Sequence, residues 1–298
     1  MPRVSELSRQ YVKLCDLRDW EDPAVVAVAR EILPERDPVA GAERKVWEFV
    51  MLALFLEDVG RLHDGTEALA VGAGDERIVF WLANRLGRVV ATDIYGEGEF
   101  AEHEAAASML EDPHAHAPFP YREDHLDVRW MDARRLDFPD GSFDVVFSLS
   151  SIEHFGKPRD IARASREIGR VLRPGGHAFV ATECFVRRHP LNAAPVDFAV
   201  RLATLGHRRA RATPRWRARM DVFTERELMT RVVRPSGLRL MQPLDRTLSP
   251  ASWANITRQS VDGWTLQTDS GDYFPHVLVQ VDRSVFTSVV LALEKPAD

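Results

Sequence analysis

Cysteine is scarce in this chain of 298 residues. Its two cysteines, Cys15 and Cys184, are too few for a framework of disulfides or for a zinc site made of four thiolates. We therefore exclude a disulfide-stapled scaffold and a four-cysteine metal centre. The reducing cytoplasm is the compartment in which we expect the protein.

Long apolar runs are missing as well. The longest one, from Phe49 to Leu56, has eight residues, whereas a helix that crosses a bilayer needs about 20. The opening segment, MPRVSELSRQ, does not contain the apolar stretch of a signal peptide. These patterns predict a protein that is neither secreted nor inserted into a membrane.

Positive charge is in the minority, and it is unevenly distributed. The net charge of -6 disfavours nucleic acid as a partner. Residues 185–220 are the exception, because they contain nine arginines and a single acid, Asp197. Guanidinium groups bind phosphates and carboxylates through paired hydrogen bonds, so an anionic acceptor is one hypothesis for this stretch. An exposed helical face that pairs with the acidic rest of the chain is the other.

The chain from residue 67 onward alternates between short apolar strands and amphipathic helices. Strands joined by helical crossovers pair in parallel and form a sheet covered on both faces. The sequence thus predicts an α/β fold with a doubly wound, Rossmann-like sheet. The predicted strands are 68–71, 88–92, 126–130, 143–148, 177–182, 238–242 and 285–293. The predicted helices are short pieces within 1–40, a buried helix at 42–59, and further helices at 78–86, 161–172 and 224–233.

Four polar or small residues are expected at the carboxyl ends of these strands, where ligands bind in open parallel sheets. Gly72 and Gly74 form a tight turn that lets a ligand approach the backbone. Asp93 can accept hydrogen bonds from two ribose hydroxyls, and Asp132 can accept one from an adenine amine. A plain strand-to-helix turn and surface or capping acids are the alternatives. Arg77 replaces the third glycine of the dinucleotide-binding pattern, which disfavours a nicotinamide cofactor.

Four segments occur in a fixed order: VGAGDER, VVATDIY, MDARRLDFPDGSFDVVFSLSSIEHF and REIGRVLRPGGHAFVAT. Together they resemble the class I S-adenosylmethionine-dependent methyltransferases, in particular methyltransferase type 11, over roughly residues 45–182 plus the last strand. The resemblance implies S-adenosylmethionine as cofactor and S-adenosylhomocysteine as product. It also implies a seven-stranded sheet whose last strand, 285–293, runs antiparallel beside the fifth. The implied parts are an N-terminal helical cap (1–64), a cofactor-binding core (65–183), and acceptor-side insertions with the last strands (184–298).

The resemblance also assigns the cofactor contacts. The residues it implies are Gly72, Ala73 and Gly74 (methionine part), Asp93 (ribose), Ile94 (adenine face), Asp132 (adenine amine), Ala133 (adenine ring nitrogen, through the backbone) and Ser148 (methionine part and methyl group). The family's acid before the first glycine is Ala70 here, and its third glycine is Glu76. The methionine ammonium therefore needs another partner, for which Asp75 and backbone carbonyls are the hypotheses.

A base near the transferred methyl group is the catalytic feature to look for, because a hydroxyl acceptor must lose a proton. His154 follows the fourth strand and has a suitable unperturbed pKa. It is the first candidate general base, and Glu153 is a weaker one. The alternative for His154 is a rim residue that caps the next helix. His189, Asp245 and His276 in the later insertions are further candidates.

No metal site is predicted. The run from His103 to His125 contains four histidines and several acids. No third ligand follows from the spacing of His114 and His116, and we interpret the run as a solvated insertion.

The acceptor pocket is expected from residues 185–220 and 243–282. The second segment has aromatic rings flanked by amides and carboxylates, which suit a sugar ring and could equally form a small core. Its residues of this kind are Trp253, Asn255, Trp264 and Tyr273. We predict O-methylation of a small molecule or glycan, with a sugar hydroxyl as the finer hypothesis. Methylation of nitrogen or carbon on another metabolite, and a cofactor-binding module without catalysis, are the alternatives.

Overall fold

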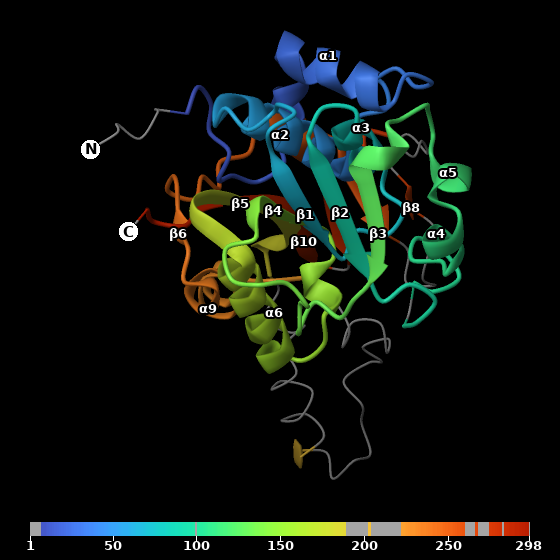
Figure 1. The fold of residues 1–298 in the computed structure, drawn as a ribbon. Coiled ribbons are helices and arrows are strands. Elements are labelled where there is room, and N and C mark those ends of the chain that lie inside the picture. The colour runs from blue at the N-terminus through green and yellow to red at the C-terminus, as the bar shows by residue number, and fades with distance from the viewer. Residues whose placement is uncertain are drawn as a thin grey trace.

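The computed structural model describes residues 7–98, 100–188, 202–203, 222–259, 266–267, 274–281 and 283–297. Its centre is one twisted sheet with helices on both faces (Figure 1). This arrangement confirms the predicted doubly wound α/β fold. Within the described residues, no helix combines the length and the apolar character that a membrane span needs.

The parallel half of the sheet consists of five strands. These are β1 (Glu67–Val71), β2 (Arg88–Asp93), β3 (Leu126–Trp130), β4 (Phe143–Leu149) and β5 (Leu172–Arg187). The register places Leu69 of β1 opposite Val90 on one side and Val146 on the other. β1 is therefore central, and its residues after Glu67 are buried, as expected for a strand covered on both faces. The first four predicted strands match these bounds within one residue, and the fifth is longer than predicted.

The other half of the sheet is built on β10 (Ser284–Glu294), which runs antiparallel to β5. It confirms the predicted antiparallel last strand. The strand count of seven was wrong, since the described sheet has ten strands. The additional pairing comes from β6 (Arg239–Leu240), β7 (Ile256–Gln259), β8 (Leu266–Gln267) and β9 (Leu278–Val281). The order is β3-β2-β1-β4-β5-β10-β9-β7-β8, with β6 also paired to β10.

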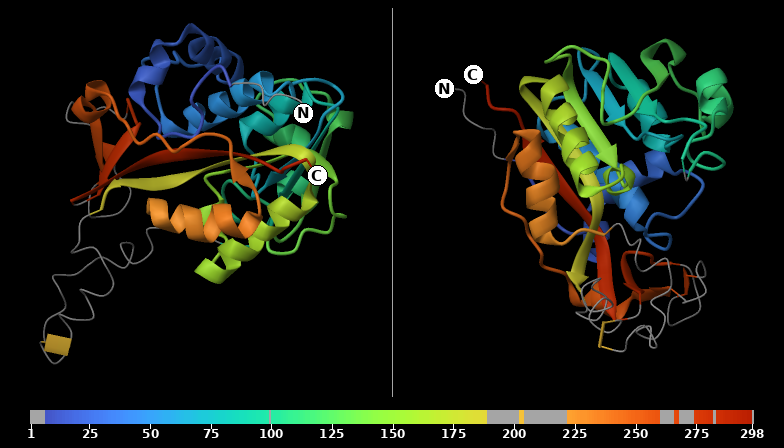
Figure 2. Two further views of the ribbon diagram at one scale, coloured as in Figure 1. Left: turned by 90° about the vertical axis from the view of Figure 1, so that its left-hand side faces the viewer. Right: turned by 90° about the horizontal axis from the view of Figure 1, so that it is seen from below.

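Helices cover the two faces of the sheet (Figures 1 and 2). α2 (Arg44–Asp58) is buried along most of its length, because its sequence is apolar on all sides after the first turn. Its Phe55 packs against Phe179 of β5, with ring centroids 5.5 Å apart. α6 (Pro158–Val171) covers the opposite face through a buried stripe that includes Ile161 and Ile168.

A second helical run packs on α6. It begins at a capping box in which Thr224 and Glu227 bond each other's backbone. It ends at Gly237, whose φ of 70° favours glycine. The run consists of α8 (Glu225–Glu227), the π-helix η6 (Leu228–Val233) and α9 (Arg234–Ser236), and it confirms the helix predicted at 224–233. The remaining helical elements are η1 (Leu17–Glu21), α1 (Pro23–Ile32), α3 (Arg77–Ala83), α4 (Ser108–Glu111), α5 (Pro113–His116), η2 (Glu123–His125), η3 (Ile152–His154) and α10 (Pro250–Ala254).

The N-terminal segment is bonded to the last third of the chain. Leu14 N donates to the carbonyl of Asp245 at 3.2 Å, and Cys15 N donates to the carbonyl of Ser288 in β10 at 2.8 Å. The buried carboxylate of Asp16 accepts a hydrogen bond from Ser252 Oγ at 2.7 Å. These contacts hold residues 14–16 against the last third of the chain.

Candidate functional site

The carboxyl ends of β1, β2, β3 and β4 meet at one edge of the sheet, because these strands run parallel (Figure 1). Hydrogen bonds join the segments that leave these ends. Ser151 Oγ, after β4, donates to the carbonyl of Gly72 at 2.6 Å. Met131 N, after β3, donates to the carbonyl of Asp93 at 2.8 Å. The structure thus brings the predicted glycine turn and the predicted acids to one edge.

The turn after β1 places Gly72 and Gly74 in the left-handed region, with φ of 69° and 49°. A Cβ on Gly72 would lie 2.6 Å from Ser151 Cβ, and one on Gly74 would lie 2.7 Å from the carbonyl oxygen of Glu104. The buried Tyr95 holds the turn, since its hydroxyl donates to the carbonyl of Gly74 at 2.9 Å. Packing within the chain therefore accounts for both glycines. Contact of these residues and of Ala73 with the cofactor stays a prediction.

Asp93 ends β2 and faces this turn. Its carboxylate accepts hydrogen bonds from Gly74 N at 2.9 Å and from Ile94 N at 2.7 Å. Burial raises the pKa of its carboxyl, and the two hydrogen bonds oppose that rise. A carboxylate accepts about four hydrogen bonds, so Asp93 keeps capacity for further donors. The chemistry of Asp93 therefore fits a ribose with two neighbouring hydroxyls.

Asp132 lies after β3, and its carboxylate already accepts hydrogen bonds from Arg134, two residues later. Its oxygens accept hydrogen bonds from Arg134 Nη2 at 2.6 Å and from Arg134 N at 2.8 Å. This pairing lowers the pKa of the Asp132 carboxyl. An adenine amine would compete with Arg134 for the same oxygens. Ala133 is buried and Ile94 is half-buried, and the adenine contacts of all three residues stay predictions.

The end of β4 carries two serines with different environments. Ser148 is buried opposite Val180, and its hydroxyl has no hydrogen-bond partner among the described residues. Burial of an unpaired hydroxyl costs free energy, and the predicted ligand contact would remove that cost. Ser150 has a φ of 47°, which is uncommon outside glycine. Its hydroxyl donates to the carboxylate of Glu48 at 2.7 Å.

Glu153 in η3 is almost fully enclosed, with 3% of its surface exposed. Thr182 Oγ1, from β5, donates to Glu153 Oε2 at 2.7 Å. Burial raises the pKa of the Glu153 carboxyl to about 7, although the neighbouring His154 lowers it in part. A carboxyl that titrates near neutral pH is suited to accept a proton. Glu153, the weaker of the two candidates predicted from the sequence, therefore lies in an environment that suits a general base.

His154 is exposed at the rim of the site. Its ring lies edge-to-face against Phe100, with centroids 4.9 Å apart. Phe100 belongs to the same segment as Glu104, whose backbone lies against Gly74. This segment therefore reaches from the glycine turn to η3. A catalytic role for His154 stays a prediction.

Three charged side chains meet beside the glycine turn, and we call them the Lys45 cluster: Lys45 and Glu48 of α2, and Glu76, which precedes α3. Lys45 Nζ pairs with the carboxylate of Glu76, donates to the carbonyl of Leu149 at 3.0 Å and lies 3.8 Å from Glu48 Oε2. Sequence reasoning missed Lys45 and Glu48. The available signal was Glu48 itself, a charged residue inside the apolar run of a buried helix.

Charge effects within the Lys45 cluster run in opposite directions. Burial raises the pKa of Glu76 to about 7, while Lys45 lowers it. Burial disfavours the charge on Lys45, but Glu76 and Glu48 outweigh that effect and raise its pKa. The carboxylate of Asp75, the neighbouring acid of the turn, lies 3.2 Å from His116 Nδ1. Asp75 is thus already engaged by a side chain of α5.

Next to this cluster, Arg44 forms an ion pair with Glu183 of β5 at 2.6 Å. His276 joins the same region through its backbone, which bonds Ala42 and Arg44 at 2.8 and 3.0 Å. Burial lowers the pKa of His276 to about 3, and the charge of Arg44 lowers it further. Its ring is therefore neutral at neutral pH. Asp245 accepts hydrogen bonds from Thr247 in its own turn, which lower the pKa of its carboxyl.

Several residues that the sequence predicts around the methyl acceptor lie outside the described residues. These are His189, Trp264, Tyr273 and most of the arginines of 185–220. Of the described ones, Trp253 is 40% exposed in α10, and Asn255 Nδ2 donates to the carbonyl of Ala251 at 2.9 Å. The contacts of Asn255 are thus local to its own turn.

The predicted histidine-rich insertion contains short helices and polar pairs. His114 Nδ1 lies 3.1 Å from Glu123, and His125 Nδ1 lies 2.8 Å from the carbonyl of Leu86. Within the part of the chain that the structure describes, no group of three or more His, Cys, Asp or Glu side chains is arranged to hold a metal ion.

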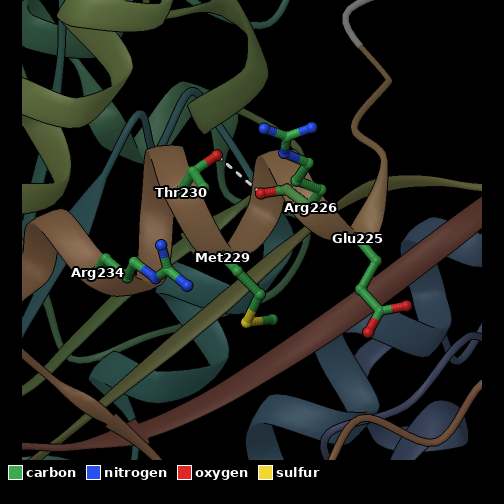
Figure 3. A pocket seen from close by; sticks show the side chains of 5 residues that line it. All are labelled: Glu225, Arg226, Met229, Thr230 and Arg234. Carbon is green, nitrogen blue, oxygen red and sulfur yellow. Dashed lines mark hydrogen bonds between the residues drawn. The ribbon is translucent and has the colours of Figure 1, made fainter.

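A separate hollow of about 440 Å³ lies on the run formed by α8, η6 and α9 (Figure 3). Thr230 Oγ1 donates to the carbonyl of Arg226 at 2.7 Å across one side of it. The residues that line it are Glu225, Arg226, Met229, Thr230 and Arg234. None of the predicted site residues is among them, so this hollow is distinct from the site at the carboxyl edge.

Comparison with known proteins identifies the central segment. Residues 69–180 match a family model described as a methyltransferase domain. Methyltransferase GfsG of Streptomyces halstedii is 29% identical over 164 residues, which are 54% of this chain and 48% of GfsG. The 27-O-demethylrifamycin SV methyltransferase of Amycolatopsis mediterranei is 43% identical over 54 residues, which are 18% of this chain and 19% of that protein. The chain thus spans about half, or less, of the length of these two relatives.

Among solved structures, one similar protein is the geranyl diphosphate C-methyltransferase of Streptomyces coelicolor A3(2), in complex with Mg²⁺, geranyl diphosphate and S-adenosyl-L-homocysteine. The superposition has a TM-score of 0.49 at 14% sequence identity and covers 98% of this chain and 91% of that one.

The matched segment runs from β1 to β5 and includes the glycine turn, Asp93, Asp132 and Glu153. Methyltransferases of this family take their methyl group from S-adenosylmethionine and release S-adenosylhomocysteine. Asp93, with free acceptor capacity at the carboxyl edge, fits the ribose of that cofactor. Residues 69–180 thus match a methyltransferase domain, and the motifs of this segment resemble those of the class I S-adenosylmethionine-dependent methyltransferases.

Proposed function

We propose that this protein transfers the methyl group of S-adenosylmethionine to a hydroxyl of a small molecule or glycan. The observation that carries the proposal is Glu153, a buried carboxyl whose pKa is raised to about 7 by burial at the carboxyl edge of the sheet. A relative is named for an O-demethyl acceptor, 27-O-demethylrifamycin SV, which supports oxygen as the methylated atom. A sugar hydroxyl is the finer proposal, supported among the described residues only by the exposed ring of Trp253.

When bound, S-adenosylmethionine supplies an electrophilic methyl group on a positively charged sulfur. In the proposed mechanism, Asp93 accepts hydrogen bonds from the ribose hydroxyls and thereby sets the position of the cofactor. Glu153 would accept the proton that the acceptor hydroxyl loses. Thr182 orients the Glu153 carboxylate through its hydrogen bond. The segment that contains Phe100 lies between the glycine turn and η3.

The charge of the acceptor is a finer part of this proposal. The described side chains around Glu153 include a second acid, Glu183, which is paired with Arg44. This pair has no net charge, so it favours neither a neutral nor an anionic acceptor. The hypothesis of an anionic acceptor depends on the arginines of 185–220, of which Arg187 and Arg188 are the described ones.

The test is transfer of label from S-adenosylmethionine labelled in its methyl group. The purified protein is incubated with it and an extract of the source cells, which is then fractionated. We expect label in metabolites or glycans, in a product whose new methyl group is an ether. Label on nitrogen or carbon would keep the methyltransferase and reject a hydroxyl acceptor. Binding of S-adenosylhomocysteine without any transfer would identify a module without catalysis and contradict the proposal.

A further inference from the structure

The Lys45 cluster has more negative than positive charge. Lys45 is one ammonium group, and it faces the two carboxylates of Glu48 and Glu76. The hydroxyls of Ser150 and Ser288 also donate to Glu48, but they bring no charge. A buried carboxylate without a full counter-charge is costly. The cluster therefore favours a ligand that brings a positive charge.

The cluster is also within reach of a ligand. Glu48 is 1% exposed, and the side chain of Glu76 is 13% exposed, whereas the side chain of Lys45 is 37% exposed. The opening therefore lies on the side of Lys45. A ligand that entered there would meet an ammonium group and a carboxylate side by side, an arrangement complementary to the carboxylate and ammonium of an amino acid.

The position of the cluster points to one part of the cofactor. Asp93, the proposed ribose partner, is among the groups that raise the pKa of Glu76. Glu153, the proposed proton acceptor, is among the groups that act on Lys45. The cluster thus lies within electrostatic range of both. With the ribose at Asp93 and the methyl group toward Glu153, the third branch of S-adenosylmethionine, its amino-acid end, would extend toward the glycine turn.

We propose that the Lys45 cluster binds the amino-acid end of S-adenosylmethionine, with Glu76 accepting hydrogen bonds from the ammonium and Lys45 donating to the carboxylate. This inference rests on the proposed function. Ala70 has no acid to offer at the end of β1, and Asp75 pairs with His116 of α5, whereas Glu76 lies beside the ammonium group of Lys45. In their place Glu76, at the start of α3, accepts the hydrogen bonds of the ammonium group.

The experiment compares two ligands that share an adenosine and a thioether. S-adenosylhomocysteine has the amino-acid end, and 5′-methylthioadenosine lacks it. Calorimetry should show that the unaltered protein binds S-adenosylhomocysteine at least tenfold more tightly. Glu76→Gln should remove at least tenfold of the affinity for S-adenosylhomocysteine and change that for 5′-methylthioadenosine less than twofold. Glu104→Gln, an exposed acid beside the same turn, is the matched control and should change neither.

A second arm uses the unaltered protein and does not depend on the folding of a variant. Burial raises the pKa of Glu76 to about 7; Lys45 opposes this rise, and Glu48 and Asp93 add to it. Glu76 therefore loses its charge as the pH falls below about 7. The preference for S-adenosylhomocysteine over 5′-methylthioadenosine should fall between pH 8 and pH 6. Both ligands have the ribose proposed to bind at Asp93. Titration of Asp93 should therefore change both affinities equally and leave their ratio unchanged.

The outcomes separate the inference from the function. Equal losses for both ligands in Glu76→Gln, or a preference that does not change with pH, would overturn the role of the Lys45 cluster and leave the proposed function standing. If the unaltered protein bound neither ligand, the proposed function would fail, and the inference would fail with it.

Discussion

The acids on the two sides of the carboxyl edge lie in different environments. Asp132, after β3, is half-exposed and paired with Arg134, which lowers the pKa of its carboxyl. Glu153, after β4, is buried against the neutral hydroxyl of Thr182, and burial raises its pKa to about 7. One side therefore keeps a fixed negative charge, and the other keeps a group that exchanges a proton near neutral pH. The environment of an acid, more than its identity, decides which role it can have.

The largest expected effect comes from removing the titrating group. Glu153→Gln keeps the shape of the side chain but cannot accept a proton, so kcat should fall by about 10²–10⁴-fold, the range for general-base catalysis. Steady-state kinetics with the labelled cofactor measure it. His154→Gln is the matched control at the rim and should retain activity within about threefold. The opposite pattern, with His154→Gln inactive and Glu153→Gln active, would exchange the roles of the two residues.

The next effect concerns Asp93, which has features of both sides: it is half-buried, and two backbone amides donate hydrogen bonds to its carboxylate. Asp93→Ala should weaken binding of S-adenosylhomocysteine by about 100-fold or more, because hydrogen bonds to a charged group contribute about 1.5–3 kcal/mol each. Calorimetry measures the affinity. Unchanged affinity would show that the ribose does not bind at Asp93.

A third effect concerns stability. The pKa of Glu153 is raised from 4.5 to about 7 in the folded protein, so the folded state binds more protons than the unfolded state between these values. The free energy of unfolding should therefore fall as the pH rises from 5 to 8, by about 2 kcal/mol from this group. Denaturant unfolding at several pH values should show a smaller fall in Glu153→Gln. An equal fall in both proteins would mean that Glu153 does not titrate in this range.

The smallest effect is expected on the other side of the comparison. Asp132→Asn should weaken binding of S-adenosylhomocysteine by less than about tenfold, since Arg134 already occupies both oxygens and a neutral hydrogen bond contributes about 1 kcal/mol. The same calorimetric titration measures it. A loss as large as that of Asp93→Ala would show that Asp132 exchanges Arg134 for the adenine amine.

Prediction from sequence succeeded where a feature depends on neighbours along the chain. The strands that end at Val71, Asp93 and Trp130 are short apolar runs with turn residues after them, and their bounds were predicted within one residue. The extension of β5 to Arg187 was not predicted, because it depends on pairing with β10, about 100 residues later in the chain. Strands β7, β8 and β9, which extend the sheet on the other side of β10, were not predicted either.

For the site, too, features set by neighbours along the chain could be predicted, and features set by distant segments could not. Gly72, Asp93, Asp132 and Glu153 could be named from motifs, since each ends a strand that the pattern reveals or follows one within four residues. Their relative importance could not be ranked. The preference for His154 followed from its unperturbed pKa. Burial raises the pKa of the neighbouring Glu153 to about 7, so the structure adds a second group that titrates near neutral pH.

Residue order alone was enough for the α/β class, the direction of the parallel strands and the edge at which their acids collect, because periodicity and turn residues act over a few positions. Packing decided which acid stays charged and which titrates near pH 7, since burial depends on side chains brought from distant segments. It also decided that Lys45 and Glu48 of α2 meet Glu76 beside the glycine turn. Solvation and charge act through space, and the fold sets those distances.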